Sequence, residues 1–169
     1  MSTSLSRWNE ADVETAMNAM TACCGAHRWA AAVVGQRPIA GDQELHAIAD
    51  QLWDAMEVPD WLEAFACHPR IGEPQSPRSL SPSSAWSTEE QSSMQTAADA
   101  TRALLAQGNA RYEQVFGFTY IVCATGKGPE EMLSILNRRL TSDRASELRE
   151  AAEQQRQIMH IRLRKWLEQ

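Results

Sequence analysis

The stretch DRASELREAAEQQRQIMHIRLRKWL, residues 143–167, decides the fold class of this 169-residue chain. It predicts the last and longest helix. At about 100° per residue, an apolar stripe forms within about 60° of Arg162, and its members are Leu148, Ala151, Ile158, Met159 and Trp166. A guanidinium in the middle of such a stripe is expected to be buried, and a buried arginine almost always has a partner.

A second charge has the same kind of placement. Residues 87–107 predict a central helix whose apolar stripe lies within about 60° of Glu90, with Met94, Ala97, Thr101, Leu104 and Leu105 as its members. An unpaired buried charge is costly, so Glu90 and Arg162 need either each other or a charged ligand. Ser87 and Glu90 also fit the S/T-x-x-E capping box. Capping and a role in a site can coexist.

The rest of the pattern is helical apart from two segments. Residues 73–86 are rich in proline and serine and predict a long loop, whereas FTYIVCA at 118–124 predicts an extended buried segment. Asn9 and Asp42 are expected to cap the first two helices. Helices are predicted at 9–23, 42–56, 60–66, 87–107, 109–116, 129–140 and 143–167. We therefore expect an all-α, single-domain bundle of about seven to nine helices that spans residues 1–169.

The amino-acid composition argues against several kinds of partner and site. The net charge is −6 and lysine and arginine form no block, so neither nucleic acid nor an anionic membrane is expected as a partner. No apolar run approaches the roughly 18 residues of a membrane span, and Glu10, Asp12 and Glu14 interrupt any signal pattern. The four cysteines form no C-x-x-C pair, so buried free thiols are expected, with neither a metal site nor disulfides. The expected location is the cytoplasm.

His68 is the first candidate for chemistry. It follows the predicted helix 60–66 and lies beside Pro69, where the chain enters the long loop. Imidazole is the side chain best suited to proton transfer near neutral pH, so His68 could serve as an acid or base. The alternative is a histidine that only satisfies the carbonyls of the last helical turn. His160 lies opposite the apolar stripe of its helix and is expected to be solvated.

Six motifs occur in order along the chain: His68-Pro69-Arg70-Ile71-Gly72; Trp86-Ser87 with Glu90-Gln91; Tyr112-Glu113 with Phe116-Gly117-Phe118; Ile121-Val122-Cys123-Ala124 with Gly126-Lys127; Glu131-Met132-Leu133; and Ile161-Arg162-Leu163. In that order they resemble the 2-oxo-4-hydroxy-4-carboxy-5-ureidoimidazoline (OHCU) decarboxylase family of purine and urate degradation. Ser93, Gly128 and Ser142 depart from the family pattern, at positions expected to affect helix ends and packing.

The resemblance implies an all-helical fold, no cofactor, no metal and a homodimer. It implies that the small-molecule substrate OHCU loses CO2 and becomes (S)-allantoin. His68 and Glu90 would be the catalytic residues. The substrate-binding residues would be Pro69, Ser87, Gln91, Ile121, Val122 and Arg162, with Ile121 and Val122 contributing backbone groups.

Two other functions fit the residue pattern. In one, the chain is a helical interaction protein, and Glu90 and Arg162 form a purely structural pair. In the other, the chain is a related lyase that acts on a different ureido acid. A structural pair predicts that removal of Arg162 unfolds the protein, whereas a site predicts a folded and inactive variant.

Overall fold

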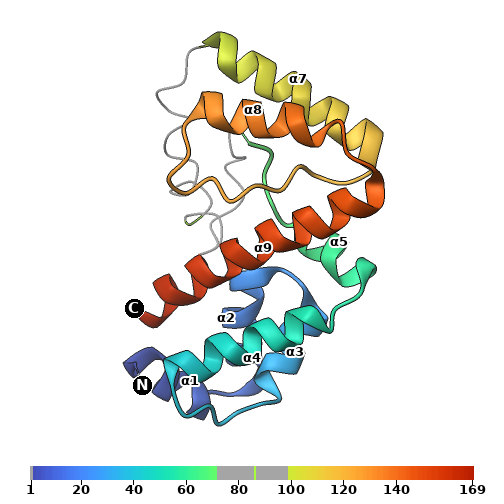
Figure 1. The fold of residues 1–169 in the computed structure, drawn as a ribbon. Helices are drawn as coiled ribbons and strands as arrows, with labels where there is room; N and C mark the ends of the chain where they lie inside the picture. The colour runs from blue at the N-terminus through green and yellow to red at the C-terminus, as the bar shows by residue number, and fades with distance from the viewer. Residues whose placement is uncertain (1, 72–85, 87–98) are drawn as a thin grey trace. The chain divides into compact units, whose positions relative to one another are not determined.

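The computed structural model describes residues 2–71, Trp86 and residues 99–169 (Figure 1). These residues contain eight helices and no strand, which confirms the predicted all-α fold class. The helices are α1 (Thr3–Glu10), α2 (Val13–Cys24), α3 (His27–Val34), α4 (Asp42–Asp54), α5 (Val58–Ala66), α7 (Asp99–Phe116), α8 (Pro129–Arg139) and α9 (Arg144–Leu167). None of these helices is long and apolar enough to cross a membrane.

The chain divides into two compact units. The first comprises Met1–Ala64 and Arg156–Gln169, and the second comprises Phe65–Gln155. The predicted loop at 73–86, except for Trp86, and residues 87–98 of the predicted central helix lie outside the described residues.

The predicted first helix, 9–23, is in fact two helices, α1 and α2. Asp12 caps α2 by accepting a hydrogen bond from the backbone N–H of Thr15 at 2.7 Å. Asn9 has a different role, because its side-chain amide pairs with the backbone of Ile39. The NH₂ group of Asn9 donates to the carbonyl of Ile39 at 2.9 Å, and Oδ1 of Asn9 accepts from the N–H of Ile39 at 3.0 Å. A carboxylate accepts strongly from the first amides of a helix, so Asp12 sets the start of α2.

The other boundaries in the first unit also differ from prediction. Asp42 is the first residue of α4 rather than its cap, and Gly41 occupies the cap position. Helix α3 was not predicted. It buries Trp29, whose indole N–H donates to the carbonyl of Ala49 in α4 at 3.1 Å. Helix α5 begins at Val58, slightly before the predicted start. Short helices of this kind are defined mainly by tertiary packing, which a local pattern does not show.

His160 was expected to be solvated, and this prediction is wrong. Its side chain is only 20% exposed, and its Nε2 lies 2.7 Å from Oδ1 of Asp50. The Nδ1 atoms of His46 and His160 lie 2.7 Å apart and share a hydrogen bond, with the rings stacked. Burial, and then the electrostatic effect of the neighbouring His160, lower the pKa of His46 below its usual range. Only one proton fits between the two nitrogens, and the lowered pKa favours the neutral form of His46.

The pH dependence of stability should report this histidine pair. Because folding lowers the pKa of His46, the unfolded chain binds the extra proton more readily. The contribution of His46 to stability is fully present above pH 6.5, which is the ordinary pKa of a histidine side chain. It is lost as the pH falls below that value. Between pH 7.5 and 5.5, the melting temperature of the parent should fall by a few degrees more than that of His46→Gln. The exposed His27, substituted in the same way, should behave like the parent, and equal pH profiles for parent and His46→Gln would contradict the assignment.

In the second unit, α7 is one continuous helix from Asp99 to Phe116. The sequence predicts instead a helix that ends at 107 and another that begins at 109. A Cβ placed on Gly108 would lie 2.4 Å from Cδ2 of Leu136 in α8. Glycine is therefore present because α8 approaches α7 closely, and it does not end the helix.

The segment after α7 contains Ile121 and Val122, two of the predicted site residues. Gly117, with φ of +79°, ends α7, and residues 118–124 are non-helical, almost entirely buried and outside any strand. Tyr112, Phe116, Phe118 and Tyr120 form a cluster of tilted and edge-to-face ring contacts, with ring-centroid distances of 4.7–6.2 Å. Helix α8 begins with Pro129 in its first turn, as predicted.

Candidate active site

His68 lies directly after α5, as the sequence predicted. Its backbone N–H donates to the carbonyl of Phe65 at 3.1 Å. Its side chain is half-buried, and Nε2 lies 2.6 Å from Oε1 of Gln155, a fully buried residue of α9. An amide oxygen accepts hydrogen bonds but cannot donate them, so this contact places the proton of the neutral ring on Nε2. Nδ1 is then the basic nitrogen of His68.

The segment that follows His68 is attached to α7 at two points. The guanidinium of Arg70 donates to both carboxylate oxygens of Glu113, each at 2.7 Å. The side-chain amide of Asn109 donates to the carbonyl of Ile71 at 2.8 Å. The hydrogen bond from Arg70 lowers the pKa of Glu113, which keeps this carboxylate ionised. The backbone around His68 and Pro69 is therefore held in a defined conformation.

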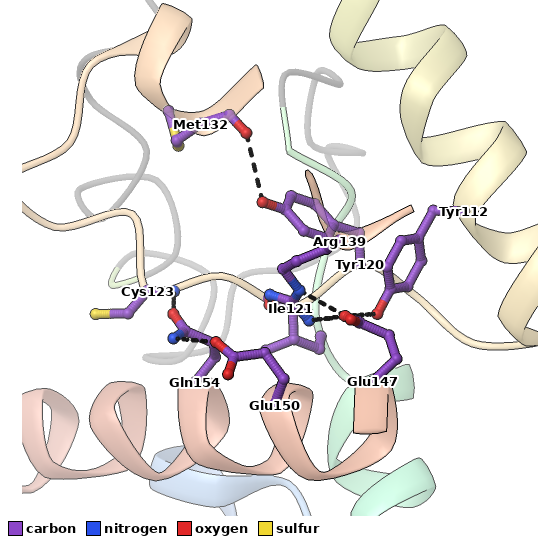
Figure 2. Close-up of polar contacts among 9 residues, drawn as sticks. All are labelled: Tyr112, Tyr120, Ile121, Cys123, Met132, Arg139, Glu147, Glu150 and Gln154. Carbon is purple, nitrogen blue, oxygen red and sulfur yellow. Dashed lines mark hydrogen bonds and ion pairs between the residues drawn. The ribbon is translucent and has the colours of Figure 1, made fainter. Parts of the chain in front are cut away.

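The predicted binding segment is held by three side chains. Nη1 of Arg139 donates to the carbonyl of Ile121 at 2.5 Å. Oε1 of Gln154 accepts from the N–H of Cys123 at 2.9 Å, and Nζ of Lys127 donates to the carbonyl of the same cysteine at 2.8 Å. Figure 2 shows Arg139 and Gln154 reaching this segment from α8 and α9.

Arg139 also belongs to a buried network of charged and polar side chains (Figure 2). Arg139 and Glu147 form an ion pair, and their residues are 2% and 1% exposed. The hydroxyl of Tyr112 donates to Oε1 of Glu147 at 2.5 Å, and the ion pair with Arg139 uses the same oxygen. The guanidinium also lies 4.9 Å from the ring centroid of Tyr120. Burial would lower the pKa of Arg139, but the neighbouring Tyr112 and Glu147 outweigh it, and the pKa is raised.

Neither this network nor the Gln155 partner of His68 was predicted, although the sequence carries a signal for both. Glu147 and Gln155 lie within about 60° of Arg162 around α9, on the stripe that identified Arg162 itself. Arg139 lies on the stripe of α8 that carries Met132 and Leu136, which are both buried. Glu147, Gln155 and Arg139 are thus polar residues on apolar stripes, the same signal that Arg162 gives.

Arg162 is buried, as predicted, with 3% of its surface exposed. Burial raises the pKa of the nearby Cys23 thiol, and the positive charge of Arg162 opposes that rise. Glu90, Ser87 and Gln91 lie outside the described residues, so the pairing of Glu90 with Arg162 stays a prediction.

The structure places four predicted site residues in the second unit: His68, Pro69, Ile121 and Val122. Arg162 belongs to the first unit, in the last part of α9. In the described part of the chain, no group of three or more His, Cys, Asp or Glu residues is arranged to hold a metal ion. Three of the four free cysteines are buried, but Cys67 is exposed, contrary to prediction.

Comparison with known proteins gives a consistent result. The family model for OHCU decarboxylase matches residues 9–164. The uric acid degradation bifunctional protein TTL of Arabidopsis thaliana is 35% identical over 145 residues, which cover 85% of this chain but only 44% of that protein. The 2-oxo-4-hydroxy-4-carboxy-5-ureidoimidazoline decarboxylase of Amia calva is 28% identical over 134 residues, covering 79% of this chain and 77% of that protein.

Solved structures agree with these relatives. A crystal structure of OHCU decarboxylase in the presence of (S)-allantoin superposes with a TM-score of 0.77 at 30% identity, covering 90% of this chain and 99% of that one. A crystal structure of (S)-allantoin synthase has a TM-score of 0.72 at 17% identity, which is a likeness of fold alone. The ordered motifs, the all-α fold and the match over 9–164 together show that this chain belongs to the OHCU decarboxylase family.

Proposed function

We propose that this chain is a carboxy-lyase that removes CO2 from OHCU and yields (S)-allantoin in urate degradation. The observation that carries the proposal is the family match over residues 9–164, which includes His68. The hydrogen bond of His68 to a buried glutamine supports it, because a catalytic imidazole needs a defined tautomer and orientation. No cofactor is proposed.

The chemistry of the substrate suits a site built from side chains. OHCU carries a carboxylate, a hydroxyl and a ureido group on one ring. When the bond from ring carbon to carboxylate breaks, its electron pair stays in the ring and spreads onto nitrogen and oxygen. CO2 leaves, and a proton must be added to one face of the ring. The protein therefore has to orient the carboxylate, stabilise the developing charge and direct one proton.

His68 is proposed as the acid and base of this reaction. With the Nε2 proton donated to Gln155, Nδ1 is the nitrogen that accepts a proton from the substrate and returns one to it. Glu90 would orient His68 or bind the nitrogens of the ureido group. Arg162 would bind the substrate oxygens through its two-pronged guanidinium.

The remaining predicted residues are proposed to fix the ring of the substrate. Ser87 and Gln91 would donate or accept hydrogen bonds from their side chains. Ile121 and Val122 would contribute backbone groups, and Pro69 would contact the substrate beside His68. The bonds that hold Ile121 and Cys123 support this role, because a backbone recognition element has to be rigid.

The direct test is to supply freshly generated OHCU and to follow its loss by circular dichroism. The spontaneous reaction gives racemic allantoin, so an optically active product identifies the catalysed reaction. We expect a dichroic signal of (S)-allantoin that grows with enzyme concentration. Racemic product at the uncatalysed rate would contradict the proposal, and a profile of other ureido acids would then test a related lyase.

Activity should be independent of metal ions. The ring can hold the electron pair that decarboxylation leaves, so the reaction does not require an electrophilic metal. After exhaustive dialysis against EDTA, kcat should stay within about twofold of its original value. Added Mg²⁺ or Zn²⁺ should not increase it. Loss of activity in EDTA that a metal then restores would refute the cofactor-free reaction.

Two further properties are proposed from the family resemblance alone. The chain is proposed to form a homodimer and to act in the cytoplasm. Sedimentation equilibrium of the purified protein tests the first property, and localisation of a tagged full-length protein tests the second. A monomer at micromolar concentration would contradict the homodimer.

A further inference from the structure

We propose that Arg139 is a positioning residue, which together with Glu147 and Tyr112 fixes the peptide between Ile121 and Val122 so that the backbone of Val122 faces the substrate. The inference rests on the proposed function, in which this segment contacts OHCU. It assigns a role to the buried network of Arg139, Glu147 and Tyr112.

The contacts of Arg139 define its orientation. Nε donates to Oε1 of Glu147 at 2.5 Å, and Nη1 donates to the carbonyl of Ile121 at 2.5 Å. Nη2 is in ion-pair contact with Glu147 and donates to the hydroxyl of Tyr112 at 3.3 Å. All three guanidinium nitrogens are therefore engaged. A planar group held at three nitrogens cannot rotate, so the bond to Ile121 has a fixed direction.

Peptide planarity transmits this direction to Val122. The only cis peptide in the described residues is Arg37-Pro38, so the Ile121–Val122 peptide is trans. In a trans peptide, the carbonyl and the following N–H point in opposite directions. Because Arg139 holds the carbonyl of Ile121, the N–H of Val122 points away from Arg139.

The next peptide is held in the same way. Gln154 accepts from the N–H of Cys123 at 2.9 Å, so the carbonyl of Val122 points away from Gln154. Gln154 is itself held, because its side-chain NH₂ donates to Glu150 at 3.1 Å. Both peptide units that flank Val122 are thus fixed by side chains of α8 and α9.

Val122 has the character of a recognition element. The residue is 4% exposed, yet none of the hydrogen bonds within residues 2–71 and 99–169 uses its N–H or its carbonyl. A buried backbone donor and acceptor normally have partners, since leaving them unsatisfied costs free energy. A substrate that carries ureido, hydroxyl and ring carbonyl groups supplies both a donor and an acceptor.

The charged pair itself points to positioning rather than to stability. Two charges removed from water lose hydration, and apolar residues of equal volume stabilise a core about as well. What apolar residues cannot do is direct a hydrogen bond to the carbonyl of Ile121. A buried arginine with a buried counter-charge keeps this directed donor at a defined place.

The test is the double variant Arg139→Met, Glu147→Gln. Methionine retains the volume of the arginine stem, and glutamine retains an acceptor for the hydroxyl of Tyr112, so no charge is left unpaired. We expect a melting temperature near that of the parent, a KM for OHCU raised about 10-fold, and kcat within about threefold. A general loss of structure would instead lower kcat and the active fraction without this selective change in KM.

Arg144 offers a matched control. It is another arginine that donates to a backbone carbonyl, that of Phe116 at 3.0 Å, but outside the segment 121–123. Arg144→Met should leave KM unchanged. If the double variant does not fold, Arg139→Lys is the test. Lysine keeps a cation beside Glu147 but carries its donors on one nitrogen, which cannot take the places of Nε, Nη1 and Nη2 at once, so its KM should also rise.

The outcomes separate the two proposals. An active parent with an unchanged KM in the folded Arg139 variants would overturn this inference and leave the proposed function standing. A folded parent that does not convert OHCU would overturn the proposed function, and the inference would fall with it. A raised KM in the Arg139 variants, with a normal KM in Arg144→Met, supports the inference.

Discussion

The variant His68→Asn is expected to retain the fold and to lose roughly 10²-fold or more in kcat, because it lacks the proposed acid or base group. Asparagine keeps a polar side chain at this half-buried position, although its NH₂ group lies near the place of Nδ1 and does not reproduce the 2.6 Å contact of Nε2 with Gln155. It cannot take up and release a proton near neutral pH. The polar character of the position is thus retained while the chemistry is removed.

Three measurements distinguish a loss of chemistry in this variant from a loss of structure. The melting temperature and the far-UV circular dichroism of His68→Asn should match those of the parent, and kcat for OHCU should fall. His27→Asn is the matched control, because the side chain of His27 is 71% exposed and pairs with Glu63 at the surface. Near-normal turnover in His68→Asn would assign the proton transfer to another residue.

The variant Arg162→Lys should lower kcat/KM by roughly 10- to 150-fold, because a charge-assisted hydrogen bond contributes about 1.5–3 kcal/mol. Lysine keeps the positive charge but lacks the planar fork that binds two oxygens at once. The position is 3% exposed, so water does not compensate for the lost donor. Both the charge and the burial are thereby largely preserved, and only the geometry of the donor changes.

A ligand-binding measurement separates a site from a structural pair. Allantoin should raise the melting temperature of the parent more than that of Arg162→Lys, because a ligand stabilises the state that it binds. Arg164→Lys, at an exposed position two residues along α9, should behave like the parent. Equal stabilisation by allantoin and equal kcat/KM would show that Arg162 is only a structural partner, as the interaction-protein alternative supposes.

The sequence alone predicted the elements whose signals are local. The apolar stripe of α9 predicted both the helix and the burial of Arg162, since a periodicity of 3.6 residues reports which face is covered. Pro129 with acidic residues beside it predicted the start of α8. The proline after His68 predicted the end of α5. The ordered motifs predicted the family, which the match over 9–164 confirms.

Tertiary structure decided the features that depend on a distant partner. Gly108 reads locally as a helix break, but Leu136 of α8 needs the space that a Cβ would fill. Asn9 reads as a cap, but its amide pairs with Ile39, and Asp12 takes the cap. Packing overrides local preference here because a buried backbone contact outweighs a fraction of a kcal/mol of propensity.

The positioning of the site depends on the same kind of distant contact. Gln155 reaches His68 from α9, and Arg139 reaches the carbonyl of Ile121 from α8. A residue pattern can show that Arg139, Glu147 and Gln155 lie on buried stripes, but it cannot show which atoms they meet. The direction of a hydrogen bond is a property of two elements packed together. The sequence therefore determined which residues are candidates for the chemistry, and only the packed structure decided how their backbone and ring atoms are oriented.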